Sequence, residues 1–404
     1  MTNDEDAVTA LFARRVPADP VVRTSAPTPA VEAISFLGAS PDPSTHPWGQ
    51  LAEVVQSVLS ERNAGVLDYD IGPGITPLRA TIATRLAARS GISLSADQIT
   101  VTHGAAGAID AAAAVLLEPG DVVFVEEFTY RTGMKSFRDR GAELIVCPAD
   151  HEGLVIDDLA SLIRRTHTDG KRPKMVYFCA NFSNPTGITL SVSRREQLGL
   201  LAERENVVLL QDDTYSQIRF LTPEPRPMLA YAPNHTILVG STSKVLTPAL
   251  RLGWSASSPR LAAALASVRI DLGVSVFIQR VADALLAPPW FDEHLSRAVD
   301  LYRAKQQRAW EFVSALSTHL TATSQPEGGF YLWLTMHGGS ADEFAASSAA
   351  RGVRVMPQSY FSPASSDGPR FRLGFSHVPI EQLDEGLRRL AVALDAYWPA
   401  NKSS

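Results

Sequence analysis

The chain has 404 residues, of which 45% are hydrophobic and 20% are charged, and its formal net charge is −6. This is the composition of a globular protein, and the length predicts two or three domains or subdomains. The acidic balance, without runs of Lys and Arg, argues against nucleic acid as a main partner. We therefore expect small-molecule partners.

The acidic start of the chain lacks the basic residues and apolar core of a signal peptide, and no later segment is apolar over a length that spans a bilayer. We expect a cytoplasmic protein with no membrane contact. Roughly the first thirty residues, rich in Pro, Ala, Val and Thr, predict an extended arm that packs elsewhere; disorder of the first few residues is the alternative. The two cysteines, Cys147 and Cys179, lie in apolar runs, which predicts buried, reduced thiols and no metal site.

Short apolar strands alternate with amphipathic helices from about residue 96. Strands are predicted at residues 98–102, 122–126, 143–147, 174–179, 207–211 and 236–240. Helices are predicted at residues 105–117, up to 138, 159–165 and 193–205. This alternation predicts an α/β fold, with a mostly parallel sheet sandwiched by helices. Ligands of such sheets bind beyond the carboxyl ends of the strands.

The pattern changes after residue 256. A long helix is predicted at residues 289–318, followed by a strand at 329–334, a helix to 351, short strands near 353 and 371, and a helix at 379–398. These elements predict a smaller α+β domain. We expect residues 1–50 to form the N-terminal arm and a segment that joins the small domain, 51–288 the large domain, and 289–404 the C-terminal small domain.

Lys244 follows the predicted strand 236–240 and lies between hydroxyl residues. A lysine in a desolvated pocket loses its proton near neutral pH and can form a Schiff base with a carbonyl group. Its neighbours Ser241, Ser243 and Arg251 combine hydroxyl donors with a guanidinium group, which suits a phosphate. Taken singly, a solvated lysine and serines that cap a helix explain these residues equally well.

A second element suited to phosphate is the segment 102–110. There the predicted strand gives way to glycine and small residues and a helix begins, so that free backbone N–H groups and the positive end of the helix dipole would face an anion. Glycine needed only for packing is the alternative.

Asp212, Tyr215 and Asn184 follow the ends of two further predicted strands. An acid there can hold a ring nitrogen protonated, and phenol and amide donors can fix a ring hydroxyl. A helix cap and a turn residue are the alternatives for Asp212 and Asn184. A lysine, an acid, ring-oxygen donors and a phosphate cup are together what pyridoxal phosphate requires.

Several motifs occur in an order that is typical of one family. They are residues 68–79, 117–130, 184–187, 212–215, 241–244 with Arg251, 326–333 and 371–375. From about residue 34 to 396 the chain resembles the pyridoxal-phosphate-dependent aminotransferases of class I/II, which have fold type I. The resemblance implies the cofactor pyridoxal 5′-phosphate, α-amino acid and 2-oxo acid substrates, and a homodimer with shared active sites.

The resemblance also implies roles for individual residues. Lys244 would form the Schiff base, Asp212 would pair with the pyridine nitrogen, and Asn184 and Tyr215 would hold the ring oxygen. Tyr130 would stack on the ring. The residues implied around the phosphate are Gly104, Ala105, Ala106, Ser241, Ser243 and Arg251, with Tyr69 reaching in from the other subunit.

Two residues are implied for the substrate. Arg372 matches the arginine that binds the substrate α-carboxylate, and a planar guanidinium fork can bond that group at two points. A surface arginine on an edge strand is the alternative. Gly38 matches the glycine of an N-terminal segment that lies against the substrate, where a plain turn is the alternative. A second arginine for a dicarboxylate is not fixed: Arg131, Arg219 and Arg280 are candidates, and solvated surface charge is the preferred interpretation of each.

The implied reaction is the transfer of an amino group from an amino acid to a 2-oxo acid. The same residues would serve an elimination, a replacement or a cyclisation, including one on S-adenosylmethionine in secondary metabolism. A ligand-sensing module fused to a DNA-binding domain is a third reading, which the short acidic start disfavours. The chain departs from the family at Ala105 and Ala106, where polar amides are frequent, and at Thr214, where proline is common.

Overall fold

The computed structural model describes residues 11–13, 33–221 and 223–400. Most of the predicted N-terminal arm, residues 1–10 and 14–32, lies outside the described residues. Within the described part, no helix combines the length and the apolar character that crossing a bilayer requires.

A seven-stranded sheet forms the centre of the larger part of the molecule, in the order β2-β10-β9-β8-β7-β3-β4. Its strands are β2 (Ile99–His103), β3 (Asp121–Glu126), β4 (Glu143–Cys147), β7 (Arg172–Cys179), β8 (Val208–Asp212), β9 (Thr236–Ser241) and β10 (Leu252–Ser257). Strand β10 runs antiparallel to both of its neighbours, and the other pairs are parallel. The predicted mostly parallel sheet is confirmed.

Helices cover both faces of this sheet because its strands are apolar on both sides. On β3, Val122 and Phe124 pack with α6 (Ile156–Thr168) and α7 (Val192–Glu205). The alternate residues Val123 and Val125 pack toward the opposite face. That face is covered by α4 (Gly104–Leu116), α5 (Arg131–Arg138) and α8 (Pro259–Ser267). All four of these valine and phenylalanine side chains are fully buried.

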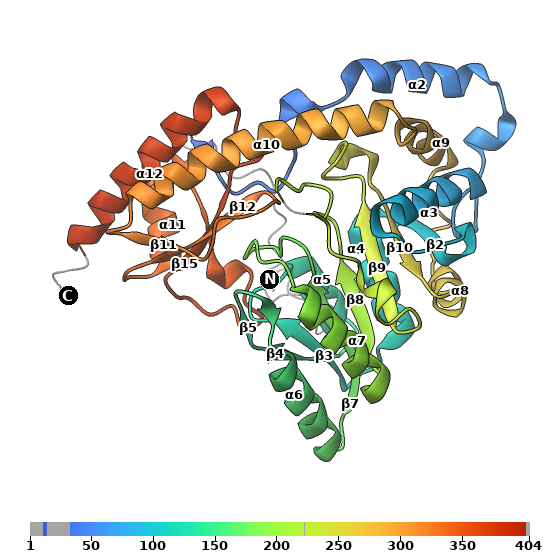
Figure 1. The fold of residues 1–404 in the computed structure, drawn as a ribbon, viewed down its shortest axis with the longest axis horizontal. Coiled ribbons are helices and arrows are strands. Elements are labelled where there is room, and N and C mark those ends of the chain that lie inside the picture. The colour runs from blue at the N-terminus through green and yellow to red at the C-terminus, as the bar shows by residue number, and fades with distance from the viewer. Residues whose placement is uncertain (1–10, 14–32, 222, 401–404) are drawn as a thin grey trace, which may run out of the picture.

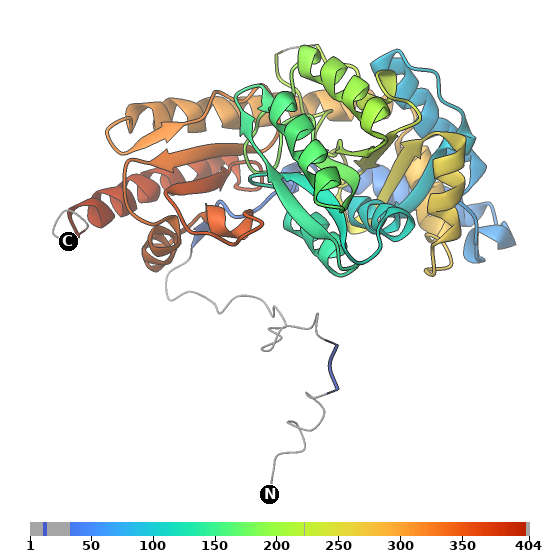
Figure 2. The same ribbon diagram turned by 90° about the horizontal axis from the view of Figure 1, so that it is seen from below.

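The last third of the chain forms a second, smaller layer. An antiparallel sheet in the order β11-β12-β15-β14 comprises β11 (Leu320–Ala322), β12 (Tyr331–Met336), β14 (Met356–Pro357) and β15 (Arg370–Gly374). Its helices are α10 (Trp290–Ala315), α11 (Ala341–Ala350) and α12 (Ile380–Ala400). In Figure 1, α10 runs from beside α9 (Val276–Leu285) across to α12. Figure 2 shows these orange and red elements gathered at one end of the molecule.

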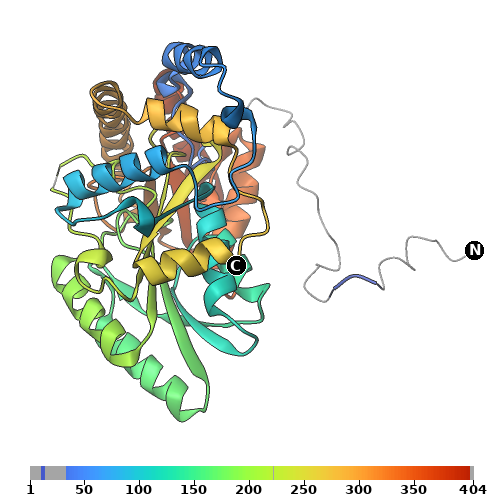
Figure 3. The same cartoon turned by 90° about the vertical axis from the view of Figure 1, so that its right-hand side faces the viewer.

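The N-terminal segment joins this smaller layer before the chain enters the larger one. Strand β1 (Ile34–Ser35) pairs in parallel with β13 (Val353–Arg354). The chain then forms α2 (Trp48–Ser60) and α3 (Thr76–Ser90), and both lie against α9 (Val276–Leu285) at the far end of the molecule (Figure 3). The domain boundaries at residues 50 and 288 stay a prediction.

One predicted element is displaced for a physical reason. The strand predicted at residues 329–334 begins at Tyr331. Gly329 has a φ of +75°, outside the range of a strand, and a Cβ built there would lie 2.8 Å from the Cβ of Phe182. Close packing on the larger layer therefore delays the start of β12.

Candidate functional site

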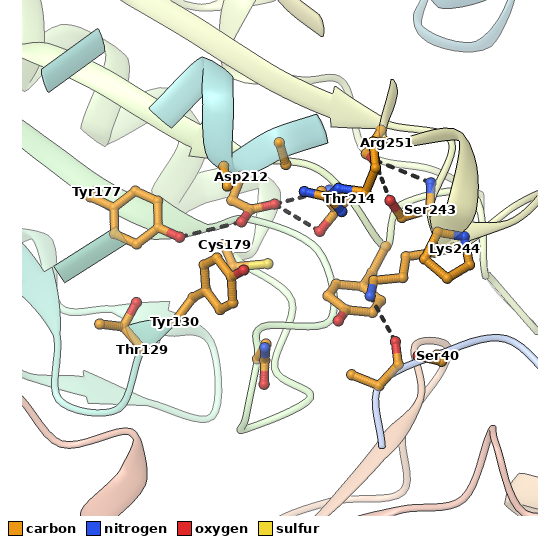
Figure 4. Close-up of a pocket in the computed structure, with 17 residues that line it drawn as sticks. Ser40, Thr129, Tyr130, Tyr177, Cys179, Asp212, Thr214, Ser243, Lys244 and Arg251 are labelled. Atoms are coloured by element: carbon orange, nitrogen blue, oxygen red, sulfur yellow. Dashed lines mark hydrogen bonds between the residues drawn. The ribbon is translucent and has the colours of Figure 1, made fainter. Parts of the chain in front are cut away.

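A cavity of about 260 Å³ lies at the carboxyl ends of β8 and β9, beside the N-terminal segment. Figure 4 shows Lys244, Asp212, Tyr130 and Arg251 around the same space. The cavity is lined by Ala39, Ser40, Ala105, Ala106, Thr129, Tyr130, Tyr177, Cys179, Asn184, Asp212, Thr214, Tyr215, Ser241, Ser243, Lys244, Pro248 and Arg251. Most of the predicted site residues are therefore brought together, while Gly38, Gly104, Arg372 and Tyr69 lie outside this lining.

Lys244 extends into the cavity from the turn after β9. Its Nζ donates a hydrogen bond of 2.7 Å to the carbonyl oxygen of Ala39 and lies 5.4 Å from the centre of the Tyr215 ring. Burial lowers the pKa of Lys244 to about 8; the Asp212 carboxylate opposes this change, and the guanidinium groups of Arg372 and Arg251 add to it. The amine is thus available in its nucleophilic, unprotonated form close to neutral pH.

Asp212 ends β8 and lies opposite Cys179 on β7. Its Oδ1 accepts bonds from the Thr214 hydroxyl at 2.8 Å and the Thr214 N–H at 3.1 Å, and its Oδ2 accepts a bond from the Tyr177 hydroxyl at 3.3 Å. Burial raises the pKa of Asp212, and these three donors oppose that change. The threonine that replaces the common proline therefore supplies an additional donor to the acid.

The start of α4 forms one wall of the cavity. The first residue, Gly104, has a φ of +67°, and a Cβ there would lie 3.0 Å from Nη2 of Arg251. His103, at the N-cap, makes no side-chain capping bond to this helix, and Ala105 and Ala106 line the cavity directly. A Cβ at Gly253 would lie 2.3 Å from the carbonyl carbon of Gly104, so β10 approaches the helix start closely. These groups form a cradle for an anion.

Hydroxyl groups complete this cradle. The Oγ atom of Ser241 lies 2.9 Å from Oγ of Ser243, and the Ser243 N–H donates to Ser241 Oγ at 3.1 Å. Arg251, in the left-handed region with a φ of +50°, begins the return of the chain into β10. Two hydroxyls, a guanidinium group and free N–H groups are the donors that a phosphate monoester accepts.

Arg372, on β15, lies at the edge of the cavity. Its Nη1 donates to Oδ1 of Asn184 at 2.6 Å, and its Nη2 donates to the carbonyl oxygen of Leu37 at 2.7 Å. Its Nε is buried and has no hydrogen-bond partner within the described residues. The guanidinium carbon lies 4.3 Å from the centre of the Tyr331 ring and 4.8 Å from that of Phe361. Such a pre-oriented guanidinium group can donate hydrogen bonds to a carboxylate.

Gly38 lies in the segment that crosses this edge. A Cβ on Gly374 would lie 2.2 Å from the carbonyl oxygen of Gly38, so the N-terminal segment packs tightly against β15. The next residue, Ala39, lines the cavity and accepts the Lys244 bond. Tyr69 lies elsewhere and is 76% exposed. Its predicted reach into a partner's site therefore stays a prediction.

Some residues at the site were not identified from the sequence. Tyr177 was included only in an apolar strand run, although a tyrosine two residues before the end of a strand shares a face with the final residue and can reach the site. Glu126 ends β3 and accepts a bond of 3.0 Å from the Cys179 N–H. Burial raises the pKa of Glu126 to about 7, and bonds from Cys179 and Ser183 oppose this change. Tyr331 lies in the motif at residues 326–333, and no role was predicted for it.

None of the candidate second arginines lines the cavity. Arg219 donates to Oδ1 of Asn181 at 3.0 Å, and Arg280 donates to Oε2 of Glu61 at 2.8 Å. Arg131 lies over the ring of Tyr360, 5.1 Å from its centre. Within the residues that the structure describes, His, Cys, Asp and Glu side chains do not form a group that could hold a metal ion. The two cysteines are free and buried, as predicted.

Comparison with known proteins places these features in context. A family model described as "Aminotransferase class I and II" matches residues 38–390. An aromatic-amino-acid aminotransferase of Thermococcus litoralis is 30% identical over 364 residues, which cover 89% of this chain and 87% of that protein. The solved structure of a multiple substrate aminotransferase from Thermococcus profundus has a TM-score of 0.89 at 28% identity, covering 97% of this chain and 99% of the other. The α-aminoadipate aminotransferase of Thermus thermophilus, complexed with N-(5′-phosphopyridoxyl)-L-leucine, has a TM-score of 0.86 at 26% identity and covers 97% of this chain and 99% of its own.

Proposed function

Because this chain belongs to the class I and II aminotransferases, we propose that its cavity binds pyridoxal phosphate and that Lys244 bonds to it covalently. The chain is a transaminase, which moves an amino group between an amino acid and a 2-oxo acid, as the motifs predicted. The observation that carries the proposal is a lysine amine with a pKa of about 8 in one cavity with a buried acid and an anion cradle.

The residues present fit this cofactor. Ala105, Ala106, Ser241, Ser243 and Arg251 provide donors for its phosphate. Asp212, held by three hydrogen bonds, suits a protonated ring nitrogen. The unpartnered Nε of Arg372 supports a further anion, the substrate carboxylate. The complexed Thermus relative holds a phosphopyridoxyl group joined to leucine, which supports the same pairing of cofactor and amino acid.

Bound in the cavity, pyridoxal phosphate would supply an aldehyde that condenses with amines and a ring that withdraws electrons. Tyr130 would pack on the ring face, and Asn184 and Tyr215 would donate to its oxygen. Asp212 would hold the proton of the ring nitrogen.

Arg372 would bind the substrate carboxylate and fix the direction of the Cα–H bond. The Lys244 amine would act as the general base that takes the proton from the substrate Cα, and as the general acid that later gives it back. The carbonyl oxygen of Ala39, at 2.7 Å, would orient this amine on the N-terminal side of the cavity. Gly38, beside it, would let this segment lie close to the substrate.

We further propose a homodimer with shared active sites. Apolar side chains are exposed on two adjoining segments, around a cavity of about 540 Å³ that is lined by residues 66–70, 271–275 and 277. Their exposed fractions are 77% for Leu67, 76% for Tyr69, 75% for Ile71, 95% for Ile270 and 53% for Leu272. Such a patch is typical of an interface. A second chain docked here would let Tyr69 reach the phosphate of its partner; a solution mass of one chain would contradict this.

The free thiols of Cys147 and Cys179 support a reducing compartment, and we propose the cytoplasm. Both side chains are buried in the large layer. Fractionation of cells that express the native chain, followed by detection with an antibody, tests this location directly.

The reaction is tested by absorbance of the cofactor-loaded protein during titration with a panel of amino acids and with S-adenosylmethionine. Transamination predicts conversion of the cofactor to its amine form by an amino acid and its restoration by a 2-oxo acid, and the best donor identifies the substrate class. Lys244→Ala should fail to form the starting covalent species. A persistent long-wavelength band without the amine form would instead favour elimination, replacement or cyclisation.

A further inference from the structure

The hydroxyl group of Tyr331 meets the hydroxyl group of Tyr215 behind the cofactor cavity. The two oxygens are hydrogen-bonded, and the ring centres lie 5.4 Å apart at an interplanar angle of 71°. Tyr331 is 1% exposed and Tyr215 is 4% exposed. Tyr215 lines the cavity whereas Tyr331 does not. The Tyr331 hydroxyl therefore lies behind Tyr215, which is the predicted donor to the cofactor oxygen.

The number of protons restricts how these two hydroxyls can be arranged. Each phenol has one proton to donate. Among the described residues, the Tyr215 hydroxyl is the one hydrogen-bond partner of the Tyr331 hydroxyl. If Tyr215 donated to Tyr331, the proton of Tyr331 would point to no described acceptor. If Tyr331 donates to Tyr215, both protons are used once an anionic oxygen occupies the cavity, because the proton of Tyr215 then points at that oxygen.

The ring of Tyr331 also contacts the substrate arginine. On the small sheet Tyr331 lies opposite Gly374, and Arg372 is two residues earlier on β15, so the two side chains share one face. The guanidinium carbon of Arg372 lies 4.3 Å from the centre of the Tyr331 ring. A cation over an aromatic face is stabilised most where water is excluded, and Arg372 is only 4% exposed.

We propose that Tyr331 is a positioning residue for the reaction: its hydroxyl directs the proton of Tyr215 toward the cofactor oxygen, and its ring holds Arg372 in line for the substrate carboxylate. This inference rests on the proposed function. Tyr331, the first residue of β12, would link the small layer to both the cofactor end and the carboxylate end of the site. The two roles belong to different atoms of one side chain and can be separated by substitution.

The hydroxyl role is tested by the pH midpoint of the absorbance change of the bound cofactor. Donors to the cofactor oxygen favour its anionic form, which predominates at high pH, so loss of a donor raises the midpoint. Tyr331→Phe should raise it by roughly half to one pH unit, the equivalent of one net hydrogen bond. Tyr215→Phe should raise it further. Tyr331→Phe added to Tyr215→Phe should then produce no additional shift, because the Tyr215 hydroxyl that links Tyr331 to the cofactor oxygen is already absent.

The ring role is tested by the KM for the amino acid. Tyr331→Leu should raise KM by about tenfold, the value of a buried cation–π contact of about 1.4 kcal/mol, while Tyr331→Phe keeps the ring and should raise KM much less. Equal midpoints for the wild type and Tyr331→Phe would overturn the hydroxyl role. So would a shift caused by Tyr331→Phe that is as large in the Tyr215→Phe background as in the wild type. Equal KM effects of Phe and Leu would overturn the ring role. A wild-type protein without a cofactor band would overturn the proposed function itself, an outcome distinct from these.

Discussion

Two lysines with lowered amine pKa values, the partly buried Lys244 and the buried Lys305, have opposite surroundings. Lys305, on α10, is fully buried, and its Nζ donates to a carboxylate oxygen of Asp42 and to the carbonyl oxygens of Ser376 at 2.8 Å and Val378 at 2.7 Å. Among the described residues, the Nζ of Lys244 has one acceptor, the Ala39 carbonyl oxygen, and it faces a cavity. Burial lowers the pKa of both amines, and Asp42 opposes this for Lys305.

We infer from this difference that burial alone would not make a lysine reactive. The three protons of the Lys305 ammonium group all have acceptors, so this group stays charged and ties the N-terminal segment to α10 and the end of β15. Lys244 retains unused donor capacity and cavity space, and it can lose its proton near pH 8. We expect a reactive lysine to need such incomplete pairing. Substitution of each lysine in turn tests whether Lys244 is reactive and Lys305 is structural.

Lys244→Ala should have the largest effect on the rate of the reaction. We expect the rate of the amino-group half-reaction, followed by cofactor absorbance, to fall about a thousandfold or more, since both the covalent bond and the general base are lost. Thermal unfolding of the cofactor-free variant should show no loss of stability, because a partly paired buried charge is removed. A variant that retains even a tenth of the wild-type rate would place the chemistry on another residue.

Lys305→Met should show the reverse pattern. It leaves Asp42 buried without its ammonium partner, so the free energy of unfolding should fall by about 3–5 kcal/mol in a denaturant titration. Lys305→Met combined with Asp42→Leu, which removes both charges, should recover most of this loss. The comparison between the two lysines breaks if the single variant is as stable as the wild type.

The same contrast extends to two arginines. Within the described part of the chain, the Nε of Arg372 has no hydrogen-bond partner. Arg195, in contrast, is fully buried and donates to the carbonyl oxygens of Leu190 at 2.9 Å and Ala180 at 2.7 Å. Arg372→Lys should raise the KM for the amino acid by about 10–100-fold, because a lysine cannot bond a carboxylate at two points. Arg195→Lys is the matched control and should lower stability with little change in KM. Similar KM effects of the two substitutions would contradict the assignment.

A pH series sharpens the assignment of Lys244. Only the unprotonated amine attacks the cofactor aldehyde, and the pKa of this amine is lowered to about 8. The rate of cofactor uptake by the cofactor-free protein should therefore rise about tenfold per pH unit below 8 and level off above it. Stopped-flow absorbance measures this rate. A profile that continues to rise to pH 10 would mean that the amine is not desolvated.

The smallest expected effect is on Thr214→Val. The Thr214 hydroxyl donates to Asp212 at 2.8 Å, and its loss should slow the half-reaction about fivefold, the equivalent of one net hydrogen bond of about 1 kcal/mol. Thr236→Val is a matched control, since the buried Thr236 hydroxyl donates to the carbonyl oxygen of Ala232 at 2.8 Å away from the cavity. Equal rates for the wild type and Thr214→Val would mean that the backbone N–H of Thr214 suffices.

The fold and the position of most site residues were predictable because they follow from local pattern. The strands at residues 122–126 and 236–240 carry apolar side chains on both faces, which is typical of a sheet covered by helices on both sides. Asp212 and Lys244 follow where such strands end. The long-range side-chain contacts around the site were not predictable. Tyr331 reaches Tyr215 across 116 residues of sequence, and Lys305 reaches Asp42 across 263. These contacts depend on how the two layers pack, which no periodicity in one sequence records.

Reduction of the cofactor-loaded protein with borohydride, followed by peptide mass mapping, tests the central claim most directly. The account predicts one phosphopyridoxyl group per chain, on the peptide that contains Lys244, with Lys305 unlabelled because all of its protons are engaged. Labelling of a different lysine, or of none after loading, would contradict it.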